Sequence, residues 1–404
     1  MIAKNAIWNT IGMTVYLACQ WLITFIVVWL YDDFTNAGYL TLAMSITNFF
    51  HYIASYNIRA FQVSDFNAEY SDTVYIIARV ITCVVSVALC AVLLLVIGYP
   101  ALQIGIVLTY MIFRVNEAFI DVLHGIDQKH WRMDHIGVSF IARGILMLTA
   151  FTLLGWQYDL LTAIIGMIVV TSLVNFLYDL PKAKKLIVLS PCSAKNIIAL
   201  LRKCFPLMIV GLISVAIPTY TRYSLERLFG AADFRAYATV NTPTMIVLVA
   251  ATLIFTPLIN VFASSLKETD YKRFVGVFIK CGAAITGIIV ITYLGALLLG
   301  EWGLTLVFGE PIRAYAYILS GAVIATGLTA LLTYLNMIFS TTRDLKGIIY
   351  GNIIGVLICI AVTDLLLNKY GLEGANYIMI LSQGVAVLFL LIRFWGTTRK
   401  KWAT

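Results

Sequence analysis

The sequence predicts an all-α, polytopic membrane protein with about twelve transmembrane helices in two lobes of six. Of its 404 residues, 61% are hydrophobic and only 12% are charged, whereas soluble domains carry about 25% charged residues. Apolar stretches of roughly 20 residues recur along the whole chain, and a hydrocarbon core about 30 Å thick needs a helix of that length to cross it. Water is therefore not the main solvent of this chain.

Apolar runs bounded by polar turns define the expected spans. Six fall in the first half of the chain, near residues 7–30, 37–60, 76–98, 101–123, 135–156 and 159–180. Six more fall near residues 205–228, 237–263, 274–299, 314–339, 347–367 and 375–395. The first run lacks the small-residue cleavage site of a signal peptide, so we expect it to remain as the first helix.

The placement of lysine and arginine predicts the orientation, because cytoplasmic connections retain positive charge during insertion. If the N-terminus lies inside, the inner connections hold most of the basic residues, including Lys182, Lys184, Lys185, Arg202 and Lys203. Both termini are then cytoplasmic. The net charge of +8 is spread over these connections rather than gathered in one patch, so it does not indicate nucleic-acid binding.

The longest inner connection, 181–203, divides the chain. We expect an N-terminal six-helix lobe at 1–180, a cytoplasmic linker at 181–203 and a C-terminal six-helix lobe at 204–404. Because each lobe begins and ends inside, the two lobes form a parallel repeat about an axis along the membrane normal.

Charged residues inside spans are the candidate functional residues, since an ionised group at the bilayer centre costs about 2.5–3.5 kcal/mol on insertion scales. Arg114, Glu117 and Asp121 are spaced so that they share one helical face. Arg114 and Glu117 are close enough to pair. This face is either a structural ion pair or the wall of a polar cavity.

Further intramembrane charges extend this set. Arg143 lies eight residues into its run, too deep to reach the interface easily, whereas Arg59 and Lys280 lie near span ends and could extend to the headgroups. Arg222 and Glu226 share a face of the seventh span. The basic residues outnumber the acids, which favours an anionic cargo, because guanidinium groups hold phosphate oxygens as a bidentate fork.

Catalytic and cofactor motifs are not found in the sequence. It has no Walker-type loop, no HExxH, no GxSxG and no dinucleotide-binding glycine pattern. We therefore expect a protein that is not an enzyme and needs no cofactor. His124, His130 and His135 surround one inner connection without ligand-spaced partners, so we expect interfacial histidines and no metal site.

Several segments resemble the polysaccharide repeat-unit flippases of the multidrug, oligosaccharidyl-lipid and polysaccharide (MOP) exporter superfamily. The resemblance extends over nearly the whole chain through diffuse features: Arg59-Ala60-Phe61-Gln62-Val63-Ser64-Asp65, Glu69-Tyr70-Ser71-Asp72, Phe205-Pro206-Leu207, Arg222, Leu306-Val307-Phe308-Gly309 and Tyr370-Gly371-Leu372-Glu373-Gly374-Ala375.

The resemblance implies a V-shaped, two-lobed transporter in the bacterial inner membrane. Its cargo would be an undecaprenyl-diphosphate-linked oligosaccharide, moved from the inner to the outer leaflet for surface polysaccharide synthesis. Arg59, Arg114, Arg143, Arg222 and Lys280 would form a cationic substrate site. Glu117, Asp121 and Glu226 would be the coupling or ion-pair residues, with H⁺ or Na⁺ as the coupling ion. Membrane lipids, a polysaccharide polymerase and glycosyltransferases are the other expected partners.

Two other functions stay open. The first is a MATE-type drug or cation antiporter of the same superfamily, against which the excess of buried arginine argues. The second is a membrane polysaccharide polymerase or ligase, which we would expect to carry a large outer loop. The longest outer connection expected here, Gly300–Arg313, is short.

Overall fold

The computed structural model is almost entirely helical. It describes residues 2–31, 35–65, 69–187, 192–255, 258, 261–262, 265–266, 270–342 and 344–401. The chain forms two compact units, an N-terminal unit, Met1–Leu212, and a C-terminal unit, Ile213–Thr404. Each unit is described by itself below.

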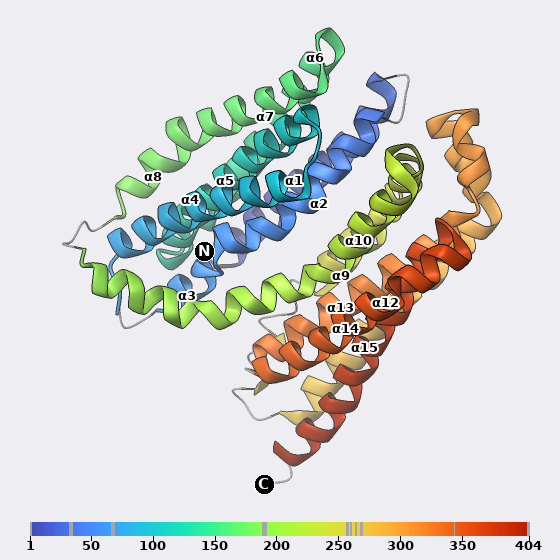
Figure 1. The fold of residues 1–404 in the computed structure, drawn as a ribbon. Helices are drawn as coiled ribbons and strands as arrows, with labels where there is room; N and C mark the ends of the chain where they lie inside the picture. Colours follow the sequence, from blue (N-terminus) through green and yellow to red (C-terminus); the bar gives the residue numbers. More distant parts are fainter. Residues whose placement is uncertain are drawn as a thin grey trace. The chain divides into compact units, whose positions relative to one another are not determined.

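The N-terminal unit is a bundle of long helices (Figure 1). In chain order they are α1 (Ile2–Leu30), α2 (Thr35–Ser55), the short α3 (Ile58–Ser64), α4 (Asp72–Ile97), α5 (Ala101–Lys129), α6 (Met133–Gln157), α7 (Leu160–Val174), the π-helical turn η1 (Asn175–Asp179) and α8 (Leu180–Lys184). Helix α5 is central, because it packs against α2, α4 and α7, while α1 packs along α6.

The C-terminal unit is likewise helical (Figure 1). It contains most of α9 (Ala194–Asn241), α10 (Met245–Phe255), α12 (Tyr271–Phe308), the 3₁₀ turn η3 (Glu310–Tyr315), α13 (Ile318–Thr341), α14 (Leu345–Tyr370) and α15 (Glu373–Lys401). Helix α13 packs against α10, α12 and α15, and α14 packs against α15.

The predicted fold class, an all-α polytopic membrane protein, is confirmed. Within the described ranges, ten helices are long and apolar enough to cross a membrane. Helices α2 and α5 correspond to two further predicted spans but are not among those ten. Helix α5 carries Arg114, Glu117 and Asp121, which lower its hydropathy, and its central place in the bundle provides partners for these charges.

Several helix ends differ from the predicted span ends. The second span ends at Ser55 instead of residue 60, because Tyr56 and Asn57 adopt left-handed backbone angles (φ 46° and 53°) and begin the separate helix α3. Helix α12 continues to Phe308 through most of the expected outer loop. The seventh helix begins at Ala194, inside the expected linker, and its one non-helical residue among those described is Gly230.

Polar side chains of α4 stabilise the end of α2. The last carbonyls of a helix have no partner within the helix and need donors from elsewhere. Both Thr82 Oγ1 (2.7 Å) and Arg79 Nη1 (3.0 Å) donate to one of these carbonyls, that of Ala54. One turn earlier in α2, Ser86 Oγ donates to the carbonyl of Phe50 at 2.6 Å. This fixes the break between α2 and α3, from which Arg59 projects.

A close crossing of α1 and α6 brings their polar side chains together. A Cβ atom built on Gly12 would lie 2.4 Å from the carbonyl oxygen of Gly137, and one on Gly137 would lie 2.3 Å from the carbonyl oxygen of Trp8. Small residues allow such backbone approach between membrane helices. One turn further along, Tyr16 contacts Phe140 with ring centroids 5.4 Å apart.

Candidate functional site

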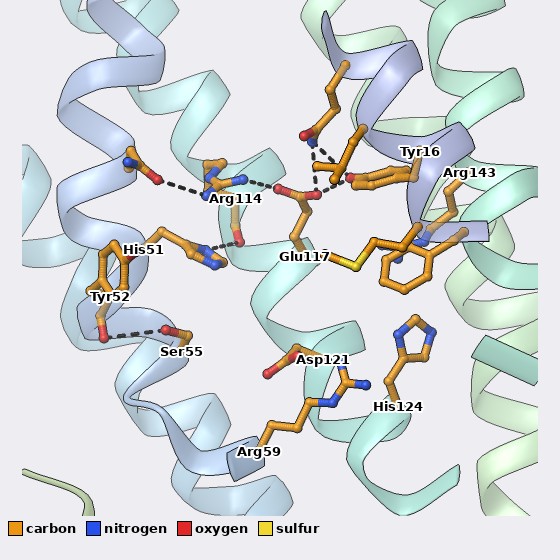
Figure 2. Close-up of a pocket in the computed structure, with 15 residues that line it drawn as sticks. Tyr16, His51, Tyr52, Ser55, Arg59, Arg114, Glu117, Asp121, His124 and Arg143 are labelled. Atoms are coloured by element: carbon orange, nitrogen blue, oxygen red, sulfur yellow. Dashed lines mark hydrogen bonds and ion pairs between the residues drawn. The ribbon is translucent and has the colours of Figure 1, made fainter. Parts of the chain in front are cut away.

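A polar cavity of about 510 Å³ lies inside the N-terminal unit. Its walls come from α1, α2, α3, α5 and α6, and the lining residues include Arg59, Arg114, Glu117, Asp121 and Arg143. Figure 2 shows these five side chains around the same space. Five of the eight residues predicted for the site are thus brought together, from the three helices α3, α5 and α6.

The predicted pair between Arg114 and Glu117 is present and spans one helical turn of α5. Arg114 Nη2 also donates to Asn48 Oδ1 of α2 at 3.3 Å. Glu117 accepts hydrogen bonds from the hydroxyl of Tyr16 and, at 3.2 Å, from Nε2 of Gln20, both on α1. The carboxylate therefore joins α1 to α5 (Figure 2).

Asp121 bridges two arginines. Its Oδ1 accepts from Arg59 Nη1 and its Oδ2 from Arg79 Nη2, each at 3.0 Å. Arg79 is fully buried, whereas Arg59 is 24% exposed and also donates to Gln128 Oε1 at 2.9 Å. Because Arg79 already balances Asp121, Arg59 keeps part of its positive charge for the cavity.

Arg143 is a buried arginine that contacts aromatic rings. Its side chain is 2% exposed, and its guanidinium carbon lies 5.0 Å from the ring centroid of Tyr16 and 5.1 Å from that of Phe140. Within the described part of the chain no carboxylate pairs with it, and its Nε has no hydrogen-bond partner. Aromatic faces attract a cation without neutralising it, so Arg143 remains a source of positive potential.

Two histidines also line the cavity. His51 Nδ1 lies 3.3 Å from the carbonyl oxygen of Arg114, and His124 Nε2 lies 3.3 Å from Asp179 Oδ1. His124 and His135 are buried within the protein, while His130 is exposed, and their place at the membrane interface stays a prediction. Their pairing with Asp179 and Asp127 could not be read from the sequence, because the carboxylate of Asp179 comes from a helix that is distant along the chain.

The other three predicted residues lie in the C-terminal unit. Arg222 and Glu226 are half-buried on α9, and Lys280 is exposed on α12. None of them lines the cavity described above, and their place in a substrate site stays a prediction. No cluster of three or more metal-ligating side chains is found in the described ranges.

The structure brings the predicted face of α5 and Arg143 to one cavity. Sequence reasoning missed several residues that line this cavity or contact its charged groups. Arg79, Gln20 and Asn48 carry no spacing signal on their own helices. Their side chains form hydrogen bonds with charged residues of α5 that lie 42 to 97 positions away in the chain. The polar residues Tyr16 and Gln20, four positions apart on α1, were the available signal for α1.

Comparison with known proteins identifies the fold. No family model and no curated protein matches the sequence. A mutant of the MATE transporter VcmN from Vibrio cholerae is similar in structure (TM-score 0.69, 15% identity, 99% of this chain and 96% of that one). So is the eukaryotic MATE transporter AtDTX14 (TM-score 0.67, 13% identity, 99% and 98% covered).

A third similar structure is a MOP-superfamily transporter from Pyrococcus furiosus, for which the reverse polarity of the binding pocket suggests a different function (TM-score 0.66, 14% identity, 98% and 95% covered). At these identities the likeness concerns the fold. The chain has the fold of MOP-superfamily transporters, with about twelve helices in two lobes, as the sequence predicted.

Proposed function

We propose that this protein is a secondary transporter that moves a lipid-linked oligosaccharide diphosphate from the inner to the outer leaflet of a bacterial inner membrane, for surface polysaccharide synthesis. The observation that carries the proposal is Arg143, a buried guanidinium that lines the cavity without a carboxylate partner among the described residues. A buried charge is destabilising unless it is compensated. An anionic cargo would supply that compensation.

The charges of the cavity support an anion over a cation. Three arginines line it against two carboxylates, and one of these carboxylates, Asp121, is also bound by Arg79 from outside the cavity. Guanidinium groups bind phosphate oxygens in pairs and remain charged at every physiological pH. Arg59, Arg114 and Arg143 come from three helices, so they can surround a diphosphate from three sides.

The remaining lining suits a polar headgroup. Asn48, Gln20 and Tyr52 offer hydrogen-bonding groups for sugar hydroxyls, and Phe140 offers an apolar ring. The volume of about 510 Å³ is within the range of roughly 300–1,000 Å³ that is common for small-molecule sites. It can hold the diphosphate and the first sugar, while the lipid tail stays in the bilayer.

Glu117 is our proposed coupling residue. Its carboxylate is held by Arg114, Tyr16 and Gln20, so it connects two helices and one cargo-binding arginine. Binding of a proton or Na⁺ to Glu117 would weaken its hold on Arg114. Arg114 would then be free for the cargo, which couples the ion to the transported anion through one side chain.

A MATE-type drug or cation antiporter is the second candidate. It is favoured by the fold, which this chain shares with MATE transporters, and by the two carboxylates that line the cavity. This function requires that Glu117 or Asp121 can bind a cation while three arginines stand nearby. The Pyrococcus furiosus transporter is a precedent for a different function in a similar fold.

An accumulation assay tests the proposal. In a bacterium depleted of the protein, lipid-linked oligosaccharides are separated by the membrane face on which they reside. The chain is then restored as wild type, Arg114→Ala, Arg143→Ala or the control Arg313→Ala, whose side chain is 60% exposed in the C-terminal unit. We expect cytoplasmic-face accumulation on depletion, rescue by wild type and the control, and failure of both cavity variants at equal protein level.

The same strains separate the alternatives. If depletion leaves lipid-linked oligosaccharides on the outer face and instead sensitises the cells to lipophilic cations, the antiporter function replaces our proposal. If oligosaccharides reach the outer face but are not polymerised, the chain acts in polymerisation.

A further inference from the structure

A second charged pair lies next to the cavity and has no role in the proposed transport cycle. His124 of α5 and Asp179 of η1 are each 1% exposed, and His124 Nε2 lies 3.3 Å from Asp179 Oδ1. Ser139 Oγ of α6 donates to Asp179 Oδ2 at 2.9 Å. Both carboxylate oxygens are thus held, by an imidazole and by a hydroxyl.

Asp179 is placed by an irregular backbone turn. Residues Asn175–Asp179 form a π-helical turn between α7 and α8. Such turns are rare and are frequent at functional sites, because they expose backbone groups and rotate side chains out of the regular helical position. Here the last residue of the turn is the carboxylate that reaches α5 and α6.

The charge of the pair depends on one proton. A hydroxyl is neutral, so the carboxylate is compensated only when the pair holds a proton, on either His124 or Asp179. With that proton the pair is neutral overall, and without it the pair is a buried negative charge. A buried uncompensated charge is unfavourable, and an imidazole changes its charge between about pH 5 and 8 in many environments.

The surroundings of the pair link it to the cavity. His124 lines the cavity, and its ring lies 5.2 Å from that of Phe140, whose ring is also contacted by the Arg143 guanidinium. The ionisable groups that act on the pair come from three other helical elements and from α5 itself: Arg59, Asp121, Asp127, Arg143 and Tyr178. Lys182 of α8 lies over the Tyr178 ring, and α7 has no ionisable residue between Leu160 and Val174.

The neighbouring pair of Asp127 and His135 is a separate unit. His135 Nδ1 lies 3.0 Å from Asp127 Oδ1, and His135 Nε2 lies 2.6 Å from Nη2 of Arg132, in the turn between α5 and α6. Neither Asp127 nor His135 lines the cavity. Of these two histidine–aspartate pairs, His124 and Asp179 is therefore the one with a member in the cavity wall.

We propose that His124 and Asp179 form a proton-binding site beside the cavity, and that its occupancy sets the net charge felt by an anion bound at Arg59 and Arg143. The second half of this statement rests on the proposed function. A unit charge about 10 Å from a bound ion, at an effective dielectric constant near 20, changes its affinity by roughly tenfold. Proton and anion then strengthen each other's binding by the same factor.

Infrared difference spectroscopy on the full chain in lipid nanodiscs tests the proton site without any cargo. As the pH is changed, we expect one carboxyl or imidazole signal of proton binding, and we expect it to be lost in Asp179→Asn and in His124→Gln. Asp179→Asn keeps the shape of the side chain and one acceptor oxygen, and the Ser139 hydroxyl can turn to accept from the new amide, so the fold should persist. The control Asp364→Asn alters a carboxylate that is 70% exposed in the C-terminal unit and should leave the signal unchanged.

Binding of an isoprenyl diphosphate, with inorganic pyrophosphate as the lipid-free arm, tests the effect on the cavity. When the pH is lowered, we expect the affinity of wild type for the diphosphate to increase about tenfold more than the affinity of Asp179→Asn does. The variant has no charge to lose at this position, so it should have the higher affinity at every pH. The titration of the probe itself is common to all variants. An infrared titration that persists unchanged in both pair variants overturns the inference. A normal infrared titration without any diphosphate binding keeps the proton site and rejects the proposed function.

Discussion

The guanidinium carbon of Arg143 lies 5.0 Å from the centroid of the Tyr16 ring, at the point where α1 and α6 cross. Tyr16 in turn donates its hydroxyl hydrogen to Glu117, which pairs with Arg114. One tyrosine therefore contacts both the unpaired cation of the cavity and its most connected carboxylate. This arrangement explains why charges that are distant along the chain act as one site.

Arg143→Met should stabilise the protein while it weakens anion binding. Methionine keeps the length and packing of the side chain but removes a buried charge that has no carboxylate partner in the described chain. We expect the free energy of unfolding to rise by about 1 kcal/mol, measured by thermal unfolding in detergent. A fall in stability would mean that the two aromatic rings compensate the charge fully, and Arg143 would then be a structural residue.

Glu117→Gln should separate binding from transport. The amide keeps hydrogen bonds to Tyr16 and Gln20 but no longer neutralises Arg114. We expect affinity for an isoprenyl diphosphate to rise about tenfold, as one charge-assisted contact is released, and net transport to fall because the coupling residue is lost. Equal transport by Glu117→Gln and wild type would exclude Glu117 from coupling.

Gly137→Ala should weaken the crossing of α1 and α6. The new Cβ would lie 2.3 Å from the backbone carbonyl oxygen of Trp8, so the helices must separate. We expect a loss of about 1–3 kcal/mol of stability together with weaker anion binding. Gly105→Ala on α5 is the matched control, since a Cβ there meets nothing within 4 Å. Similar effects of both substitutions would show that the crossing does not depend on this close approach.

Protonation of Asp65 at acidic pH should lower the stability of the fold. Burial alone would raise the pKa of Asp65, but hydrogen bonds from the backbone N–H groups of Glu69 (2.9 Å) and Tyr70 (3.1 Å) and from the Tyr75 hydroxyl (2.9 Å) lower its pKa. A lowered pKa in the folded state stabilises the fold above the unfolded pKa of about 3.9, and this stabilisation is lost as pH falls through the folded pKa.

The comparison that isolates this effect is Asp65→Asn. At neutral pH we expect it to reduce stability by about 1.5–3 kcal/mol, the usual worth of hydrogen bonds to a charged group. Below about pH 4 the melting temperatures of wild type and variant should converge. A difference that stays constant down to strongly acidic pH would show that the carboxylate charge is not what stabilises this turn.

Much of the fold follows from local sequence. Apolar run length predicted the helices because the bilayer imposes one length on every span, and α-helical spacing placed Arg114, Glu117 and Asp121 on one face. The break after Ser55 was missed, because the two residues with left-handed backbone angles there, Tyr56 and Asn57, are neither glycine nor proline. Pairings such as His124 with Asp179 could not be predicted, since they depend on how separate helices pack.

Ligand binding by the purified chain tests the central claim most directly. Wild type and Arg143→Met in nanodiscs are titrated with an isoprenyl diphosphate and with tetraphenylphosphonium, a lipophilic cation. We predict that wild type binds the diphosphate, that Arg143→Met binds it about tenfold to a hundredfold more weakly, and that neither protein binds the cation. Binding of the cation by wild type, strengthened in Arg143→Met and without binding of the diphosphate, would contradict the anionic cargo.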